Sequence, residues 1–482
     1  MIDTGALRKE IINLAVQGKL VSQKSDEGDT EDIYDLLRKK GKKTFADISE
    51  ENMSFSIPNS WRWGTLSDLT FDNELNDGNW VLKEDMVDFG PVKLIQLGNI
   101  GDCKYIEKGY KYLTEEHFLE LNSRQIYPGY LLINRLVVKD MYSCIIPDVK
   151  GILMTAVDVC WVAPNIERYN IEYIMYALSS NDFRNKVQSL GHGVTRFRIS
   201  KTNLINIAFP IPPISEQNRI VKKIKELFKL LDRIDALQTQ YSSDLEVLKS
   251  KIIDAGIQGK LTEQLPEDGT AEELLEQIEI QKNTILKNRK GRVDKKIKAI
   301  DGDFPYEIPS HWKWIRFGNI GLFKKGPFGS ALTKSMFVPK GKNTVKVYEQ
   351  QHAINKDNTL GTYYITREYF DDSMSGFEVL PGDIIVSCAG TIGETYIMPD
   401  DIEQGIINQA LMRVTLAEGV NRKFFQYYFD ANLKKSAQNE SNGSAIKNIP
   451  PFDVMKNWYF PIPPLEEQER IVEKIENILT LL

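Results

Sequence analysis

Residues 214–261, in the middle of the chain, read ISEQNRIVKKIKELFKLLDRIDALQTQYSSDLEVLKSKIIDAGIQGKL. They follow two prolines, and they contain no proline and no glycine before Gly256. Apolar residues recur at alternating steps of four and three, with only Gln238 breaking the series: Ile220, Ile224, Leu227, Leu231, Ile234, Tyr241, Leu245, Leu248 and Ile252. This heptad spacing predicts a long α-helix that packs lengthwise against another helix. At 1.5 Å per residue, about 40 helical residues span roughly 60 Å.

The partner helix is present in two pieces, one at each end of the chain. At a separation of 251 residues, the C-terminal apolar residues match the start of the central stretch: Ile471, Ile475, Ile478 and Leu482 match Ile220, Ile224, Leu227 and Leu231. At a separation of 241 residues, the N-terminal region matches its end: Leu7, Ile11 and Gln17-Gly18-Lys19-Leu20 match Leu248, Ile252 and residues 258–261. We therefore predict a circular fold in which the second helix is interrupted by the chain ends.

The segments between the helices form a tandem repeat. The motif Ile-Pro-x-x-Trp-x-Trp occurs at residues 57–63 and again at 308–314. Phe-Pro-Ile-Pro-Pro occurs at 209–213 and again at 460–464, each time followed by Glu-Gln. The second copy has ten extra residues, which we place near 288–298 because that stretch reads as a basic linker. A predicted helix over 170–190 has its counterpart over 421–441.

The expected fold class is α+β, with two similar globular domains separated by long antiparallel coiled-coil-like helices in a circular pseudo-two-fold arrangement. The predicted organisation is an N-terminal spacer-helix end and charged helix (1–50), a first target domain (51–213), the central spacer helix (214–261), a charged helix and basic linker (262–300), a second target domain (301–464) and a C-terminal spacer helix (465–482).

Composition indicates a protein of the reducing cytoplasm that has no structural zinc. The chain has 482 residues, 42% hydrophobic and 27% charged, which is enough for two or three domains. Its four cysteines and four histidines are scattered singly. No apolar run reaches membrane-spanning length, and residues 1–9 lead into an amphipathic helix rather than a signal peptide. The net charge of −6 argues mildly against a simple electrostatic nucleic-acid binder.

Motifs for catalysis are missing from the sequence. There is no GxxxxGK[ST] phosphate loop. Residues 448–452, Asn-Ile-Pro-Pro-Phe, resemble an amino-methyltransferase signature, but an isoleucine is inserted and no glycine-rich cofactor strand accompanies them. We interpret them as a proline turn, and Asp148-Val149-Lys150 as a surface turn rather than half of a nuclease site. We expect no catalytic residue, bound cofactor or metal.

Polar loops of the two globular domains carry candidate nucleic-acid contacts. A basic side chain in such a loop suits a phosphate or a guanine edge. Lys447 falls at the position of Arg196 in the repeat, so both copies place a cation there. The candidate contacts are Arg135, His192, Thr195, Arg196, Arg198, Lys324, Lys325, Ser330, Ser387, Thr391, Ser444 and Lys447. The alternative for each is a solvated loop side chain, and His192 taken alone fits that alternative better.

The tryptophan pairs and the charged helices each have a structural interpretation. Trp61/Trp63 and Trp312/Trp314 are spaced to face one side of a strand, and we favour packing onto the long helix over base stacking. Charged helices are predicted over 31–40 and 272–282, acidic before basic. They fit either a protein-docking surface or an ordinary exposed helix.

The repeated motifs, the long helix and the Gln-Gly-Lys-Leu at its end resemble the specificity subunit of a type I restriction-modification enzyme. The resemblance covers essentially the whole chain. It implies a non-catalytic subunit whose two target-recognition domains each read one half of a bipartite site in double-stranded DNA through the major groove. The helices would set the spacing and bind two methyltransferase subunits, which restriction (translocase/nuclease) subunits would join. S-adenosylmethionine and ATP would bind to those partners.

One departure from the family pattern is the short C-terminal helix, which ends at Leu482 and leaves positions 232–241 without a counterpart. Members of the family place this break at different points. The alternative function is a coiled-coil adaptor with two protein- or ligand-binding domains. A fused methyltransferase-endonuclease is disfavoured by the missing cofactor motifs. We predict that Arg196→Ala or Lys447→Ala weakens DNA binding by the assembled methyltransferase without disturbing assembly.

Overall fold

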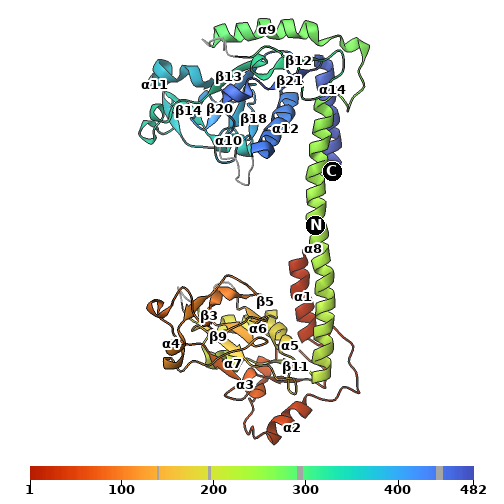
Figure 1. The fold of residues 1–482 in the computed structure, drawn as a ribbon, viewed down its shortest axis with the longest axis vertical. Helices are drawn as coiled ribbons and strands as arrows, with labels where there is room; N and C mark the ends of the chain where they lie inside the picture. Colours follow the sequence, from red (N-terminus) through yellow and green to blue (C-terminus); the bar gives the residue numbers. More distant parts are fainter. Residues whose placement is uncertain (138–139, 194–196, 290–296, 441–448) are drawn as a thin grey trace. The chain divides into compact units, whose positions relative to one another are not determined.

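The computed structural model describes residues 1–137, 140–193, 197–289, 297–440 and 449–482. The chain forms two compact units, unit 1 (Met1–Gln240) and unit 2 (Tyr241–Leu482). Helix α8 (Ile214–Ile257) begins in unit 1 and ends in unit 2 (Figure 1). Among the described residues, no helix combines the length and apolarity needed to cross a membrane.

The predicted central helix is confirmed as a single helix of 44 residues, α8, which ends at Ile257 rather than Leu261. Gly259 adopts a φ of +69°, and the N–H of Lys260 donates to the carbonyl of Ala255 at 2.9 Å. This left-handed glycine closes the helix end, as is usual for a C-terminal cap. In the N-terminal copy, α1 (Thr4–Val16) is followed by Gly18, whose φ is also +69°.

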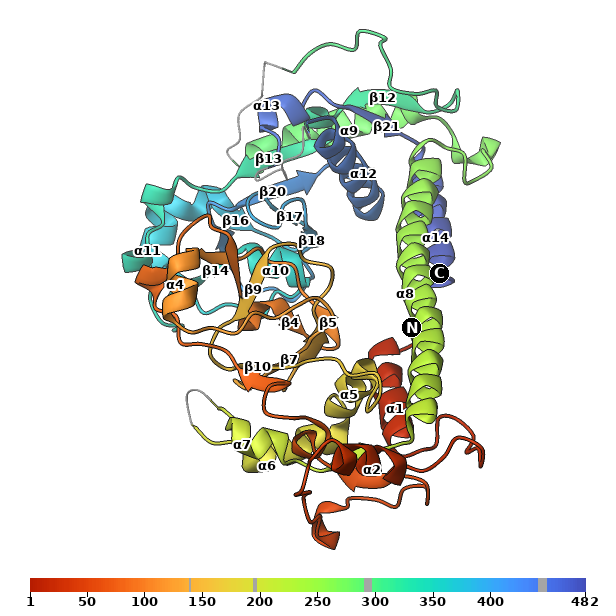
Figure 2. The same cartoon turned by 60° about the horizontal axis from the view of Figure 1, so that its bottom comes forward.

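In unit 1, α1 lies antiparallel beside the first part of α8. The backbone of Ile2 bonds to Gln238, whereas Arg8, further along α1, pairs with Asp232 at 2.9 Å and with Asp235 at 2.8 Å. α1 also packs against α5 (Ile171–Leu178) and α6 (Asn181–Leu190), and Figure 2 shows α5 beside it.

In unit 2, α14 (Leu465–Thr480) runs back along the last part of α8 (Figure 1). The two helices approach closely at Gly256, where a Cβ atom would lie 2.7 Å from Cδ1 of Ile475. Ile471 and Ile475 are fully buried there. Each chain end therefore supplies a helix that packs on α8, as the split partner helix predicts.

The two units contain four-stranded antiparallel sheets of the same topology. The strand order is β2-β10-β7-β8 in unit 1 and β13-β20-β17-β18 in unit 2. The strands are β2 (Leu75–Asp77), β10 (Val159–Val162), β7 (Leu131–Asn134), β8 (Ser143–Ile145), β13 (Gly321–Lys325), β20 (Leu411–Leu416), β17 (Ile384–Ser387) and β18 (Thr395–Ile397).

A second sheet and a short ribbon also recur in both units. The second sheet has the order β6-β3-β9 in unit 1 and β15-β14-β19-β16 in unit 2, with parallel pairing of β3 to β9 and of β14 to β19. The ribbon joins β1 to β11 in unit 1 and β12 to β21 in unit 2. These strands are β6 (Lys111–Leu113), β3 (Val92–Ile95), β9 (Ile152–Thr155), β15 (Tyr364–Thr366), β14 (Thr344–Tyr348), β19 (Gly405–Ile407), β16 (Glu378–Val379), β1 (Arg62–Gly64), β11 (Phe209–Ile211), β12 (Lys313–Arg316) and β21 (Tyr459–Ile462).

Two of the predicted helices differ from the structure by more than their end residues. The helix predicted over 170–190 is two helices, α5 and α6, because the Ser180 side chain caps a new start by accepting from the N–H of Phe183. Its counterpart α12 (Arg422–Glu440) is continuous. The charged helices are α2 (Glu31–Lys39) and α9 (Ala271–Asn288), and α9 extends beyond residue 282 because Leu286 continues its buried face.

Candidate functional site

The repeated Trp and Glu residues join each globular part to one of the paired helices, α8 in unit 1 and α14 in unit 2. The indole N–H of Trp61 donates to Oε2 of Glu216 at 2.8 Å, and that of Trp312 donates to Glu467 at 2.7 Å. All four side chains are buried. Packing onto the helix, the role predicted for the first tryptophan of each pair, is therefore confirmed. Burial also raises the pKa of Glu216.

The second tryptophan of each pair has a different environment. Trp61 precedes strand β1, so it does not share a strand face with Trp63 as predicted. The Trp63 ring lies 5.1 Å from Phe55 and 4.5 Å from the amine of Lys186. Trp314 stacks on Phe304 in an aromatic cluster. The ring contacts of Trp63 and Trp314 are thus with residues outside α8 and α14.

The glutamine that follows each glutamate connects a second element. Gln217 accepts from the backbone N–H of Asn170 at 2.8 Å and donates to the carbonyl of Pro212 at 2.8 Å. Gln468 makes the same bonds to Asn421 and Pro463, at 2.7 Å and 3.0 Å. The Pro-Pro-x-x-Glu-Gln motif thus fixes the start of the long helix to both the ribbon and the helix α5 or α12.

Most predicted contact residues of unit 1 lie at one end of its four-stranded sheet. We call this the loop end of the sheet: the end at which β2 and β7 finish and β10 begins. Arg135 follows β7 but is buried, with 7% of its surface exposed. Its Nε donates to Asp77 at 2.9 Å and its Nη1 donates to the carbonyl of Ile199 at 2.8 Å. The structure therefore places Arg135 in an interior ion pair, not on the surface expected of a DNA contact.

The loop bearing the other unit 1 candidates closes on the same end. His192 and Arg198 exchange backbone hydrogen bonds of 3.0 and 2.9 Å, which pairs the two residues in an antiparallel bridge. Arg198 also donates to the buried carboxylate of Asp158 at 2.6 Å, while His192 is exposed. Thr195 and Arg196 lie between them, outside the described residues.

The loop end of the unit 2 sheet is the end at which β13 and β17 finish and β20 begins, and it presents two exposed lysines. Lys324 and Lys325 end β13, and within the described part of the chain neither forms an ion pair. The amine of Lys324 sits 4.7 Å from the centre of the Phe377 ring. Both line a hollow of about 490 Å³ with residues 326–329, Phe377 and Gln409. Ser330, just beyond this hollow, is exposed.

The remaining unit 2 candidates separate into buried and exposed residues. Ser387 is fully buried: its hydroxyl donates to the carbonyl of Thr391 at 2.5 Å and accepts from the N–H of Glu394 at 3.0 Å. It therefore holds the turn on which the Thr391 side chain is exposed. Ile449 bonds to Cys388 at the same end, while Ser444 and Lys447 lie outside the described residues.

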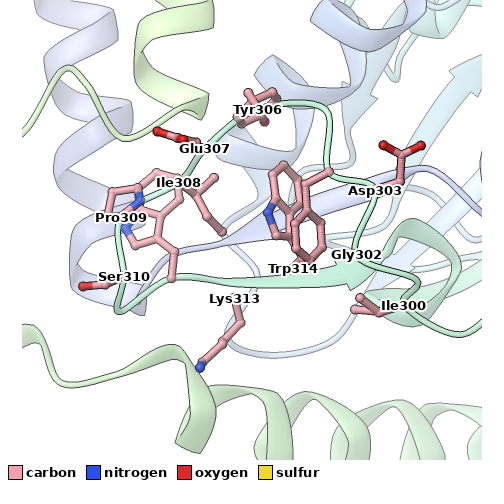
Figure 3. A pocket seen from close by; sticks show the side chains of 12 residues that line it. Ile300, Gly302, Asp303, Tyr306, Glu307, Ile308, Pro309, Ser310, Lys313 and Trp314 are labelled. Atoms are coloured by element: carbon pink, nitrogen blue, oxygen red, sulfur yellow. The ribbon is translucent and has the colours of Figure 1, made fainter.

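Another hollow, of about 820 Å³, lies beside β12 in unit 2 (Figure 3). Phe304, Tyr306 and Trp314 form its aromatic wall, with Tyr306 and Trp314 ring centres 5.0 Å apart. Lys313 at its edge pairs with Glu272 of α9 at 2.6 Å. None of the predicted contact residues lines this hollow, so the loop ends remain the candidate site.

Comparisons with known proteins agree with the repeat. Residues 150–240 and 310–481 match the family described as "Type I restriction modification DNA specificity domain". The chain is 22% identical over 540 residues to the type I restriction enzyme EcoAI specificity subunit of Escherichia coli, covering 98% of this chain and 88% of the relative. It is 22% identical over 552 residues to the EcoEI specificity subunit of the same organism, with the same coverage.

A solved structure has a related fold. It comes from work titled as the complex assembly and conformational transition of the type I R-M system. The TM-score is 0.56 at 16% sequence identity, and the match covers 89% of this chain and 92% of the other.

Proposed function

Since the chain belongs to the type I restriction modification DNA specificity family, we propose that each of its units reads one half of a bipartite site in double-stranded DNA. The observation that carries this proposal is the repeated geometry. Both units have the same strand order, and each gathers polar loop residues at the same end of its four-stranded sheet. Base edges and phosphates are read by such side chains. We assign the base and phosphate contacts to the exposed candidates and not to the buried Arg135 and Ser387.

We further propose that the paired helices fix the spacing between the half-sites and dock two methyltransferase subunits. Part of α8 is left uncovered, because Leu237 and the heptad residue Tyr241 are 59% and 61% exposed. Exposed apolar residues on a helix are a common contact for another protein. Half-sites about one helical turn of DNA apart, roughly 34 Å, would suit a rigid helical spacer.

Catalysis is assigned to partner subunits in the cytoplasm. Methyl transfer from S-adenosylmethionine and ATP-dependent restriction would take place in the methyltransferase and restriction subunits. The sequence supports this division, since it has no GxxxxGK[ST] loop and no intact amino-methyltransferase signature.

The test is to express the chain with its methyltransferase and map methylated bases across the host genome. We expect one bipartite motif, methylated only when both proteins are present. An assembled complex that methylates no bipartite motif would contradict the proposal. The adaptor alternative has no support from the comparisons.

A further inference from the structure

Both units expose an aromatic ring just beyond the edge strand of the four-stranded sheet. In unit 1, β2 is followed by Gly78, Asn79 and Trp80. In unit 2, β13 is followed by Gly326, Pro327 and Phe328. Trp80 is 63% exposed and Phe328 is 89% exposed. Since β2 and β13 occupy the same place in their sheets, the two rings occupy equivalent positions.

The glycine in each segment fixes the path of the chain. A Cβ atom on Gly78 would lie 2.1 Å from the carbonyl oxygen of Ala156, the residue directly after β9. A Cβ atom on Gly326 would lie 1.8 Å from the carbonyl oxygen of Asn408, the residue directly after β19. No side chain fits at either position. The close approach sets where the ring two residues later leaves the sheet.

The backbone hydrogen bonds at these glycines also match. The N–H of Gly78 donates to the carbonyl of Val159, the first residue of β10, at 3.0 Å. The N–H of Gly326 donates to Leu411, the first residue of β20, at 2.9 Å. A single exposed aromatic residue needs no explanation. The same exposure at a rigidly defined position in both repeats, with a different ring in each, indicates a shared role.

The surroundings of the rings are suited to DNA. Phe328 shares its hollow with Lys324 and Lys325, which can neutralise phosphates. In unit 1, Asn79 pairs with Ala156, and the same β9–β10 turn carries Asp158, which binds Arg198. Each ring therefore follows the edge strand at the loop end of its sheet, and Phe328 has two exposed lysines beside it. In unit 2 the ring can contact a base while the two lysines neutralise phosphates.

We propose that Trp80 and Phe328 are base-contacting residues, one in each unit, and that each ring packs as an apolar wedge against a base step of its half-site. This inference rests on the proposed function and adds a specific residue to each reading surface. Apolar side chains that unstack a base step are a known means of deforming and holding a duplex.

The experiment uses the complex of the full chain with its methyltransferase and a fluorescent duplex carrying the methylated motif. Trp80→Ala and Phe328→Ala should each lower affinity about ten-fold or more, the size expected for loss of one base–ring contact. Trp80→Phe and Phe328→Tyr should restore most of it. Ile166→Ala is the matched control, because Ile166 is 88% exposed and follows β10 at the opposite end of the sheet.

Two further measurements, assembly with the methyltransferase and discrimination at each half-site, distinguish a base contact from a structural role of the ring. Each alanine variant should lose discrimination at base pairs of one half-site only, and should co-purify with the methyltransferase as the unmodified chain does. Unchanged affinity in both alanine variants, or loss of assembly, would overturn the inference. If the unmodified complex binds no bipartite duplex at all, both the proposed function and this inference are contradicted.

Discussion

At the scale of single residues, the hydrogen bonds of the Glu-Gln pair explain why the Pro-Pro-x-x-Glu-Gln motif occurs twice, once at the start of α8 and once at the start of α14. Glu216 accepts from Trp61 at 2.8 Å and from Gln23 at 2.6 Å, and Gln217 bonds to the start of α5. Glu467 and Gln468 make the matching bonds in unit 2. A buried polar group destabilises the fold unless it is hydrogen-bonded, so each Glu-Gln pair requires its tryptophan, glutamine and backbone partners.

The raised pKa of Glu216 gives a pH prediction. Burial makes the folded protein hold the carboxyl proton more tightly than the unfolded chain does. The contribution of Glu216 to the free energy of unfolding is therefore fully present below the pKa of the unfolded chain. It is lost as the pH rises through the higher pKa of the folded protein. Glu216→Gln should lose this dependence and gain stability relative to the unmodified chain as pH rises above about 4.5.

Urea denaturation of both proteins at pH values between about 4.5 and 7 measures the difference. Gln23→Ala, which removes a neighbour of Glu216 but leaves the carboxyl, serves as the control and should retain a pH dependence of the same sign. A constant stability difference between Glu216→Gln and the unmodified chain across the range would show that the carboxylate is not penalised by burial.

At the scale of elements, the contact of α8 with α14 depends on a glycine within a helix. Gly256 leaves no room for a Cβ, since Ile475 Cδ1 would lie 2.7 Å away and Ile471 Cγ2 3.2 Å away. The corresponding position in α1 is Ala15, which is buried in unit 1. The two helix pairs therefore share this repeat position but differ in the residue there, glycine in α8 and alanine in α1.

Gly256→Ala should destabilise unit 2, although alanine favours helix in general. Overpacking of this kind typically costs about 1–3 kcal/mol. Thermal denaturation should show a lower midpoint for this variant. Gly5→Ala is the matched control in α1, because its Cβ would meet only the Asp3 carboxylate at 3.3 Å. Equal midpoints for Gly256→Ala and the unmodified chain would contradict the close packing.

The exposed part of α8 gives a second prediction at this scale. Leu237→Asp should weaken co-purification with the methyltransferase while leaving the melting temperature of the isolated chain within about 1 °C, because Leu237 is 59% exposed. Leu119→Asp in α4 (Glu115–Glu120) is the control, with a 69% exposed leucine away from the long helix. Undiminished co-purification of Leu237→Asp would remove this face of α8 from the proposed docking surface.

At the scale of the whole molecule, the chain is a duplicated unit with diverged loops. The ribbon, the two sheets and the helix contacts recur, whereas the loop ends differ in charge: Asp77 ends β2 and Lys325 ends β13. Such a pattern fits a scaffold that keeps its geometry while its binding loops vary.

Duplication predicts that substitutions act on one half-site each. Arg198→Ala should relax methylation specificity in one half of the motif, and Lys325→Ala should affect binding to the other half. Genome-wide mapping of methylated bases, with Lys39→Ala in α2 as a control for loss of charge, would measure this. Relaxation of both halves by either variant would argue against independent reading by the units.

The amino-acid sequence is sufficient to predict the long helix, its split partner and the duplication. Heptad spacing is a local property of the chain, and the Ile-Pro-x-x-Trp and Glu-Gln motifs return because the same buried bonds must be made twice. The separation of 251 residues also marks Glu467 and Gln468 as the equivalents of Glu216 and Gln217.

Which polar residues face solvent depends on the three-dimensional fold. Arg135 and Ser387 look like surface residues at strand ends, yet Arg135 pairs with Asp77 of a remote strand, and the turn over 388–394 closes on Ser387. The tertiary fold also revealed Trp80 and Phe328. Their glycines lie 248 residues apart, outside the 251-residue frame, and become equivalent only through the carbonyls of Ala156 and Asn408. Periodicity is encoded in local spacing, whereas exposure depends on strand pairings between remote residues, which spacing does not record.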